Sequence, residues 1–447
     1  MADLMTLVGK TYVVKTFGCQ MNLHDSERVC GLLDQCGCIC VDETDQADIV
    51  VFMTCCVREN ADQRLYGQAS AMVSAPKPPC GRRVVAIGGC IAQRDGEKIR
   101  KNIPVADVVF GTSALASLPE LLAEAFADDG SVVEVDTGEE DRGFSADLPS
   151  RRSQRFHAWV PIMQGCNNFC TYCIVPYVRG REKSRTLEAV VAECEKLVAD
   201  GVREITLLGQ NVNSYGRNIY GEPRFAELLR AVGQTGVERI RFTSSNPKDL
   251  SEQTIRAMAE VPAVMPHLHL AVQSGSTRVL RAMNRSYTRE EYLDLARRLK
   301  EAIPGLALST DIIVGFPGET EEDFEETLSH VKEAGFSSAF TFIYSPRVGT
   351  RAADMPDQIP EAESSRRIQR LIAIQKEITH RRYAAYVGQV HSVLVDEASK
   401  RDENQMAGKN EYNITVNFPG SKELIGRIVR VRITSAGEST LRGELVE

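Results

Sequence analysis

Several features are missing from this sequence of 447 residues, and each absence narrows the possible functions. No apolar run approaches the length of a membrane-spanning helix, and the first residues lack the charged-then-apolar pattern of a secretion signal. Internal repeats and low-complexity tracts are also missing. We therefore expect a cytoplasmic globular protein with no membrane association and, at this length, two or three domains.

A surplus of positive charge is also missing. The net charge of −8 argues against a protein that coats nucleic acid indiscriminately. Basic residues nevertheless gather in two islands, which suits a polyanion held at one place, although a solvated helix face with counter-charges would look the same. The first island comprises Arg151, Arg152, Arg155, Arg179, Arg181, Lys183 and Arg185 against the single acid Glu182; the second comprises Arg366, Arg367, Arg370, Lys376, Arg381 and Arg382.

Cysteine, in contrast, is abundant, with thirteen in the chain. Three of them, Cys166, Cys170 and Cys173, form a Cys-x3-Cys-x2-Cys run in the segment GCNNFCTYCI. Three thiolates this close can hold three irons of a 4Fe–4S cluster and leave the fourth iron open to a small molecule. A zinc site would normally close with four ligands, and His157 is the only nearby histidine. A disulfide is disfavoured without an export signal.

The first part of the chain alternates apolar strands with helical patterns. Strands are predicted at 12–17, 48–53, 83–88 and 106–110, and helices at 22–35, 57–72, 92–101 and 114–126, with Asn22 as a helix N-cap. The near-continuous apolar strands are typical of a parallel sheet covered on both faces. This pattern predicts a doubly wound α/β domain.

Three further cysteines stand just after strands of that sheet. Cys19, Cys55 and Cys90 each lie between a strand and the following helix. In open parallel sheets, ligands bind at this carboxyl edge, so the three positions predict a second three-thiolate cluster with an open iron. The alternative is three buried structural cysteines. Cys56, beside Cys55, is the rival ligand.

An acidic and then Gly/Ser/Pro/Arg-rich linker follows the first domain. After this linker, the sequence again alternates strand and helix patterns in repeated units. The predicted strands are 159–163, 204–208, 239–243, 267–271, 307–314 and 339–344, and helices fall between them at 187–199, 225–232, 250–258, 289–300 and 321–334. Six such units suit a partial parallel (β/α)6 barrel, whose active site lies at the carboxyl ends of its strands. The cysteine-rich loop follows the first strand and meets that rule.

The sequence pattern changes near the end of the chain. A helix at 364–379 precedes short strands at 389–396, 412–418, 425–433 and 440–446, separated by Gly and Pro. This pattern predicts one small β-barrel module. We therefore expect an N-terminal cluster domain at 9–127, a linker at 128–153, a barrel at 154–382 and the β-module at 383–447.

With these parts placed, the chain resembles the methylthiotransferase family of the radical S-adenosylmethionine (SAM) superfamily, most closely its tRNA-modifying branch. The stretches that carry the resemblance are 16–22, 165–185, 208–216 (LGQNVNSYG), 241–248 (RFTSSNPK), 272–276 (VQSGS) and 315–320 (GFPGET). The chain departs from the family at Met53, Asn246 and Ala271, where Asn, His and Pro are usual, and at Val348 and Arg351, which replace prolines. None of these positions is a cluster cysteine.

The resemblance implies a radical SAM tRNA methylthiotransferase with a TRAM module at its C-terminus. Its reaction replaces the C–H at C2 of N6-isopentenyladenosine, beside the anticodon of tRNA, with C–SCH3. Two 4Fe–4S clusters and two SAM molecules per turnover are implied. One SAM methylates sulfur held at the cluster of Cys19, Cys55 and Cys90. The other, at the cluster of the Cys-x3-Cys-x2-Cys loop, yields a 5′-deoxyadenosyl radical.

The chemistry of adenine is consistent with a radical reaction at C2. C2 of adenine has no acidic proton, which makes general-base chemistry a poor choice. The base must leave its stack and enter between two clusters that face each other. The resemblance also implies an electron donor of the flavodoxin or ferredoxin type, and we expect a monomer.

Five residues are predicted to bind SAM. Tyr172 stands beside the last cysteine of the loop, which suits adenine packing, and the other four, Gln210, Asn211, Gln273 and Ser309, lie at or near strand carboxyl ends. Each of them can equally be a hydrogen-bonded polar group of the scaffold. The basic residues that flank the cysteine loop, Arg179, Arg181 and Arg185, are predicted to contact tRNA.

Two rival functions follow from the same residues. Ribosomal-protein methylthiotransferases share the chemistry, but the Gln-Met-Asn after Cys19 and the Asn-Val-Asn-Ser-Tyr segment favour tRNA. A non-catalytic Fe–S protein that binds RNA through the β-module belongs to a different class.

Overall fold

The computed structural model describes residues 3–56, 59–76, 78, 81–128, 131–135, 148–399 and 402–446. Cys80 and residues 129–130 and 136–147 of the expected linker lie outside the described residues. None of the described helices has the length and apolarity needed to cross a membrane. The chain forms two compact units: an N-terminal unit (Met1–Gln154, Trp159–Asn167, Cys173–Arg185) and a C-terminal unit (Arg155–Ala158, Asn168–Tyr172, Thr186–Glu447).

The N-terminal unit contains a six-stranded sheet with the order β2-β1-β3-β4-β5-β6, in which every neighbouring pair is parallel. Its strands are β1 (Thr11–Thr16), β2 (Ile39–Cys40), β3 (Ile49–Thr54), β4 (Val84–Gly89), β5 (Val108–Phe110) and β6 (Val132–Glu134). The doubly wound prediction is confirmed. Strand β6 was not predicted and falls within the expected linker.

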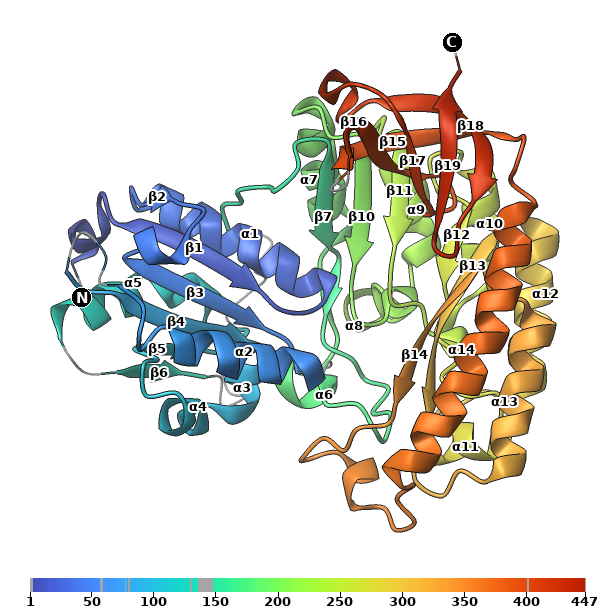
Figure 1. The fold of residues 1–447 in the computed structure, drawn as a ribbon, viewed down its shortest axis with the longest axis horizontal. Helices are drawn as coiled ribbons and strands as arrows, with labels where there is room; N and C mark the ends of the chain where they lie inside the picture. Colours follow the sequence, from blue (N-terminus) through green and yellow to red (C-terminus); the bar gives the residue numbers. More distant parts are fainter. Residues whose placement is uncertain are drawn as a thin grey trace. The chain divides into compact units, whose positions relative to one another are not determined.

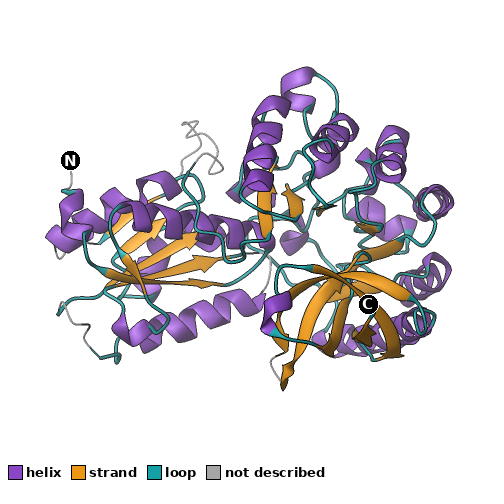
Figure 2. Ribbon diagram, turned by 90° about the horizontal axis from the view of Figure 1, so that it is seen from above, coloured by secondary structure: helices purple, strands orange, loops and turns teal. Residues whose placement is uncertain are grey.

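Helices cover both faces of this sheet (Figure 2). One apolar core forms with α1 (Gln20–Gln35) and α5 (Leu118–Ala127), and the other with α2 (Glu59–Ala71), α3 (Cys90–Asp95) and α4 (Glu97–Asn102). Alternate residues of β3 pack into the two cores: Val51 lies in the first, while Val50 and Phe52 lie in the second. Burial on both sides explains why the strand is apolar throughout.

Two of these helices begin earlier than predicted. Cys19, not Asn22, is the N-cap of α1, and α3 begins at Cys90 rather than Ala92. The unit also contains β8 (Met163–Gln164), β9 (Lys183–Ser184), α6 (Val175–Val178) and the 3-10 helices η1 (Leu4–Leu7), η2 (Thr44–Gln46) and η3 (Leu115–Ser117).

The C-terminal unit is built on the predicted partial barrel (Figure 1). Two three-stranded sheets, in the orders β11-β10-β7 and β12-β13-β14, are joined by parallel bridges from Ile240 to Val264 and from Ser245 to Leu270. The strands are β7 (His157–Pro161), β10 (Glu204–Leu208), β11 (Arg239–Phe242), β12 (His267–His269), β13 (Ala307–Val314) and β14 (Ser338–Ile343).

The barrel helices are α7 (Leu187–Ala199), α9 (Phe225–Gly233), α10 (Glu252–Glu260), α12 (Arg289–Ala302) and α13 (Glu321–Ala334), with the short α8 (Arg217–Tyr220) and α11 (Thr277–Ala282). Capping boxes begin two of them: Thr288 with Glu291 at α12, and Thr320 with Asp323 at α13. The 3-10 helices η5 (Val212–Ser214), η6 (Pro247–Asp249) and η7 (Arg351–Asp354) lie in loops.

After α14 (Glu361–Ala384) comes a closed five-stranded barrel with the order β15-β16-β17-β19-β18. Its strands are β15 (Val390–Ser399), β16 (Asp402–Asn410), β17 (Thr415–Pro419), β18 (Ile428–Ala436) and β19 (Thr440–Leu445), with η8 (Lys422–Leu424). The sequence predicted only four strands. Strand β16 was missed because its inward residues, Met406, Gly408 and Asn410, do not form an apolar alternation.

Two buried arginines at the amino end of β11 attach this module to the larger barrel. Arg239 donates hydrogen bonds to the carbonyls of Lys409 and Ser392, and Arg241 donates to the carbonyl of Asn410 at 2.7 Å. The attachment therefore lies at the amino end of the strand, and active sites of such barrels lie at the opposite, carboxyl edge.

Candidate functional site

Cys19, Cys55 and Cys90 lie at the carboxyl edge of the N-terminal sheet, directly after β1, β3 and β4. Strands β1 and β3 are neighbours at the point where the strand order reverses, which is where such sheets bind ligands. Cys55 and Cys90 are buried, and Cys19 is half-buried. All cysteines that the structure describes are free thiols.

Glycines bring these cysteine-bearing turns together. Gly18 has φ +142°, and a Cβ added to it would lie 2.2 Å from the Cβ of Cys55. Gly89 has φ +95°, and its Cβ would lie 2.5 Å from the carbonyl oxygen of Thr54. A side chain at either position would push the turns apart. Neither glycine was used in predicting the site, although the Gly-Cys dipeptide at the end of β1 and of β4 is a sequence signal that could have indicated the close approach.

The thiols of this edge interact in pairs. A hydrogen bond from Cys55 lowers the pKa of Cys19 to about 6, with help from the positive charge of Arg179. A hydrogen bond from Cys56 lowers the pKa of Cys90 to about 7, again with help from Arg179. The same bond to Cys90 raises the pKa of Cys56. Two predicted ligands thus favour the thiolate form, whereas the rival Cys56 is held as a thiol.

Arg179 itself is not on the surface, where the tRNA-contact prediction placed it. Its side chain is 8% exposed, and its Nη2 lies 2.9 Å from Asp25 Oδ2 and 3.2 Å from Asn22 Oδ1. Arg185 is buried as well and donates to the carbonyl of Pro161 at 3.1 Å. These two predictions are wrong because a run of basic residues does not reveal which of them face inward. Arg181 alone is exposed.

The donor set suits an iron–sulfur cluster better than a single metal ion. Among the described residues, no three His, Cys, Asp or Glu side chains are arranged to hold one ion. In a cubane cluster each thiolate binds a different iron, so the sulfurs need not converge on one point. Cysteine sulfurs of lowered pKa beside a guanidinium match that requirement. His157, weighed for zinc, lies in the C-terminal unit, is half-buried, and has Nε2 3.0 Å from Thr206 Oγ1.

The loop that carries Cys166, Cys170 and Cys173 lies between β8 and α6. In the N-terminal unit, Gly165 has φ +78°, and an added Cβ would lie 2.0 Å from the carbonyl oxygen of Arg181. The backbone N–H of Cys166 donates to the carbonyl of Gly180 at 3.1 Å. The start of the loop is therefore fixed to the segment that follows α6.

Two side chains of the C-terminal unit hold the centre of the same loop. Asn284 donates to the carbonyls of Asn168 and Phe169 at 3.1 and 3.0 Å, which supports the positive φ of +46° at Phe169. Buried Arg285 places Nη1 3.4 Å from the sulfur of Cys170. Neither residue was predicted as functional, since nothing in the sequence relates positions 284 and 285 to the loop.

The predicted SAM residues occupy varied surroundings in the C-terminal unit. Tyr172 is half-buried against the apolar cluster around Phe316. Gln210 and Asn211 follow β10, and the amide of Asn211 donates to Asp249 at 2.8 Å. Gln273 follows β12 with φ +70°. Gln210, Asn211 and Gln273 thus lie beyond strand ends, while SAM binding by all four residues stays a prediction.

Ser309, in contrast, does not lie beyond a strand end. It is the third residue of β13, near the amino end, and its Oγ lies 3.1 Å from His267 Nε2 and 3.1 Å from His269 Nδ1. Its predicted place at a strand carboxyl end is wrong: β13 has the predicted bounds, and Ser309 lies in its amino half. Asn246, where the family usually has His, is buried and accepts a hydrogen bond from the backbone N–H of Lys248, so it caps η6.

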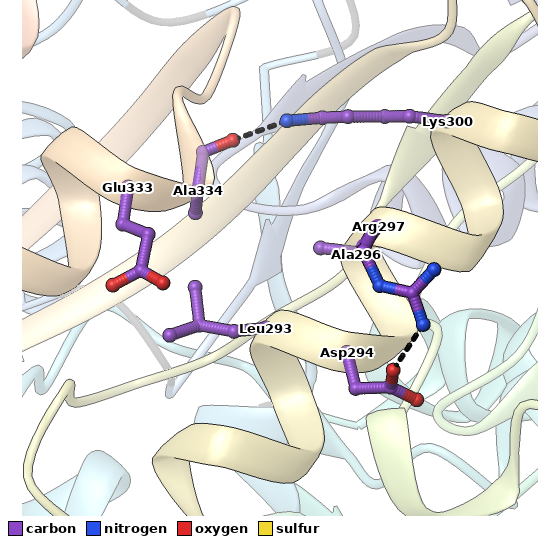
Figure 3. Close-up of a pocket in the computed structure, with 7 residues that line it drawn as sticks. All are labelled: Leu293, Asp294, Ala296, Arg297, Lys300, Glu333 and Ala334. Carbon is purple, nitrogen blue, oxygen red and sulfur yellow. Dashed lines mark hydrogen bonds and ion pairs between the residues drawn. The ribbon is translucent and has the colours of Figure 1, made fainter.

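Two other surface features carry no chemistry. A depression of about 460 Å³ between α12 and α13 is lined by charged groups that bind one another or the backbone, such as Lys300 on the carbonyl of Ala334 (Figure 3). Most of the second basic island, on α14, is neutralised: Arg366 and Arg370 pair with Glu321, and Arg367 pairs with Glu319. The counter-charge interpretation therefore holds for these three arginines and for Arg381, which pairs with Glu377, whereas Arg382 donates to Ser337 Oγ.

Three family models match parts of the chain. The Radical SAM superfamily matches residues 160–331, a family described as "Uncharacterized protein family UPF0004" matches 11–111, and the TRAM domain matches 384–446. Among solved structures, the radical S-adenosylmethionine methyltransferase TsrM from Kitasatospora setae matches with a TM-score of 0.56 at 15% identity, covering 77% of each chain. This likeness supports the fold alone.

Curated relatives match almost the whole chain. A tRNA-2-methylthio-N(6)-dimethylallyladenosine synthase from Clostridium botulinum (strain Hall) is 47% identical over 97% of this chain and 96% of its own length. Proteins with the same name from Clostridium novyi (strain NT) and Thermoanaerobacter sp. (strain X514) are 45% identical over 98% of this chain, covering 97% and 93% of their own lengths.

Proposed function

The chain belongs to the family of the tRNA-2-methylthio-N(6)-dimethylallyladenosine synthases, and from this premise we propose its reaction in detail. It is a radical SAM tRNA methylthiotransferase that converts N6-isopentenyladenosine next to the anticodon into its 2-methylthio derivative. High identity across all three modules supports this assignment over an Fe–S protein that only binds RNA.

The two cysteine triads are proposed to hold two 4Fe–4S clusters. Cys166, Cys170 and Cys173 form what we call the loop site; Cys19, Cys55 and Cys90 form the auxiliary site. When bound, the first cluster supplies reductive cleavage of SAM, and the second holds the sulfur that is methylated and transferred. One observation supports the second cluster above all: three segments that are distant in sequence meet at one edge of the sheet. They approach so closely at Gly18 and Gly89 that a larger residue would not fit at either position.

SAM is proposed to bind beyond the ends of the barrel strands, through Tyr172, Gln210, Asn211 and Gln273. The Oδ1 atom of Asn211 is buried and has no hydrogen-bond partner among the described residues, which suits an acceptor that waits for a ligand donor. Ser309 is left out because two histidines already occupy its hydroxyl. Two SAM molecules are used per turnover.

For tRNA, we propose that exposed basic residues replace the buried Arg179 and Arg185. Arg181 is exposed, and on the TRAM barrel Arg430 and Arg432 project outward from β18. No described carboxylate forms an ion pair with either residue of β18; Arg432 donates one hydrogen bond to the carbonyl of Gly388, and the positive charges of both residues suit phosphates. We further propose a monomeric cytoplasmic enzyme that receives electrons from a flavodoxin- or ferredoxin-like protein.

Iron and sulfide analysis tests the two-cluster proposal. After anaerobic reconstitution we expect about eight irons per chain, falling to about four in the Cys19/Cys55/Cys90→Ala variant and to about four in the Cys166/Cys170/Cys173→Ala variant. A Cys56→Ala variant is the matched control and should retain about eight. An unchanged iron content in the first variant would remove the auxiliary cluster.

Nucleoside mass spectrometry tests the substrate. In tRNA from a deletion strain, 2-methylthio-N6-isopentenyladenosine should disappear and N6-isopentenyladenosine should accumulate, and the intact gene should restore the modification. Unchanged tRNA together with a lost methylthio group on a ribosomal protein would instead support the protein-modifying rival.

A further inference from the structure

Arg179 lies in the N-terminal unit, at the end of the short helix α6, and its side chain crosses to the start of α1. It caps α6, while its guanidinium lies 2.9 Å from Asp25 Oδ2 and 3.2 Å from Asn22 Oδ1. Its positive charge adds to a thiol hydrogen bond in lowering the pKa of Cys90, and Cys90 packs in the same apolar cluster as Ile174 and Val178, at the two ends of α6. The side chains of Arg179 and Asp25 are only 8% and 4% exposed.

A buried guanidinium is costly unless its charge and its donors are satisfied. Asp25 compensates the charge, and Asn22 takes a further hydrogen bond. Both come from the first turns of α1, directly after Cys19, so the arginine is fixed by the same segment that carries a predicted ligand. The other groups whose charge acts on the guanidinium are the sulfurs of Cys90 and Cys19.

Anchoring of α6 does not require this arrangement. Ile174 and Val178 insert into the apolar core between the sheet and α3, and Thr112 donates to the carbonyl of Val178 at 3.0 Å. The helix would keep its place with a neutral side chain at position 179. The buried ion pair is therefore explained better by its effect on the neighbouring cysteines than by anchoring.

The reduction potential of an iron–sulfur cluster depends on its net charge, on hydrogen bonds to its sulfurs and on solvent exposure. A guanidinium close to a ligand sulfur acts through the first of these. It stabilises the more negative, reduced state of a cluster, and a carboxylate beside it opposes that effect.

We propose that Arg179 and Asp25 form a charge pair that positions Cys90 and sets the reduction potential of the auxiliary cluster, Arg179 raising it and Asp25 lowering it. Arg179 acts as a positioning residue through Cys90 and does not itself contact tRNA. This inference rests on the proposed auxiliary cluster of Cys19, Cys55 and Cys90.

The test uses the full chain with Cys166, Cys170 and Cys173 replaced by alanine, so that only the auxiliary cluster is present. The midpoint potential and the EPR spectrum of the dithionite-reduced protein are measured for Arg179→Gln, Arg179→Lys and Asp25→Asn. Arg366→Gln, which removes a paired arginine on α14, is the matched control.

The expected shifts have opposite signs. Arg179→Gln should move the midpoint potential to a more negative value and change the EPR spectrum, and Arg179→Lys should recover part of the shift because it retains the charge. Asp25→Asn should move the potential to a more positive value. Arg366→Gln should leave both readouts unchanged.

Two results would overturn the inference. The first is an unchanged potential and spectrum in Arg179→Gln at full iron content; the second is a shift of the same sign in Arg179→Gln and Asp25→Asn, which indicates general damage to the site. A parent protein that binds no iron would refute the auxiliary cluster itself, and the inference with it. Iron content and thermal unfolding of each variant separate these cases from simple loss of folding.

Discussion

The auxiliary site and the loop site use the same local parts in different tertiary settings. Each has a glycine with positive φ directly before its first cysteine, Gly18 in one and Gly165 in the other. Each also has a buried arginine whose charge acts on a cysteine sulfur: Arg179 on Cys90, and Arg285 on Cys170, to which it also donates a hydrogen bond.

The arginines differ in what surrounds them. Arg179 is paired with the carboxylate of Asp25. Arg285 instead bonds to the hydroxyl of Tyr287 and to the carbonyl of Ala271, each at 2.8 Å, and no carboxylate pairs with it in the described part of the chain. The positive charge at the loop site is therefore uncompensated by protein, whereas at the auxiliary site it is neutralised. Similar motifs can thus present different fields to the groups they bind.

The glycines should give the largest effects. Gly89→Ala forces a Cβ to within 2.5 Å of the backbone of Thr54 at φ +95°, so we expect the turn carrying Cys90 to move away. The variant should lose about four irons, and the N-terminal unit should lose about 3 kcal/mol or more of unfolding free energy. Metal analysis and chemical denaturation measure the two effects.

Gly180→Ala is the matched control, since φ there is +74° but no atom lies within 4 Å of the added Cβ. It should cost only about 1 kcal/mol and leave the iron content intact. Equal losses in both variants would show that backbone strain, rather than close approach at the auxiliary site, explains the glycine.

Arg285→Gln tests the difference in charge compensation. In a chain that lacks the auxiliary cysteines, the loop cluster should shift to a more negative potential, and by more than the auxiliary cluster shifts in Arg179→Gln. Without Arg179, burial favours the protonated form of Asp25, and this lost negative charge offsets part of the lost positive charge, whereas no described carboxylate pairs with Arg285. Loss of its buried hydrogen bonds should also cost about 2 kcal/mol. Redox titration followed by EPR gives the shifts. A smaller shift at the loop site than at the auxiliary site would contradict the comparison.

Lowering the pH should reduce the stability of the two units to different extents. The effect of each titrating group should be smaller than that of the glycine substitution Gly89→Ala. Burial lowers the pKa of His330 in the C-terminal unit to about 3, so it stays neutral when folded. The unfolded chain takes up this proton below the usual pKa of about 6.5, and stability falls as the pH drops from there towards 3, by about 2 kcal/mol at pH 5. Burial opposes ionisation of Asp25, but Arg179 lowers its pKa overall, so its contribution lasts until the pH falls below the ordinary range of a carboxyl group.

Thermal unfolding at pH 7 and pH 5 measures this contrast. His330→Leu removes the group and should reduce the pH dependence of the C-terminal unit by about 2 kcal/mol. If the variant loses as much stability as the parent between the two pH values, other groups account for the acid sensitivity.

The sequence alone was sufficient for every feature that depends on local periodicity and spacing. The apolar runs of β3 and β4 predicted a parallel sheet because strands buried on both faces cannot alternate. The spacing of Cys166, Cys170 and Cys173 is set by the covalent chain, and the strand-to-helix changes located Cys19, Cys55 and Cys90 at one edge. Family, fold class and reaction followed from these patterns together with the resemblance they carry.

Only the tertiary structure decided which charges are buried and which turns touch. Arg179 and Arg181 are nearly adjacent in sequence, yet one is buried against Asp25 and the other is exposed. Ser309 engages two histidines, and Gly89 touches the end of β3, through contacts between distant segments. Burial and close approach are pairwise properties of segments brought together by folding, so no single stretch of residues contains them.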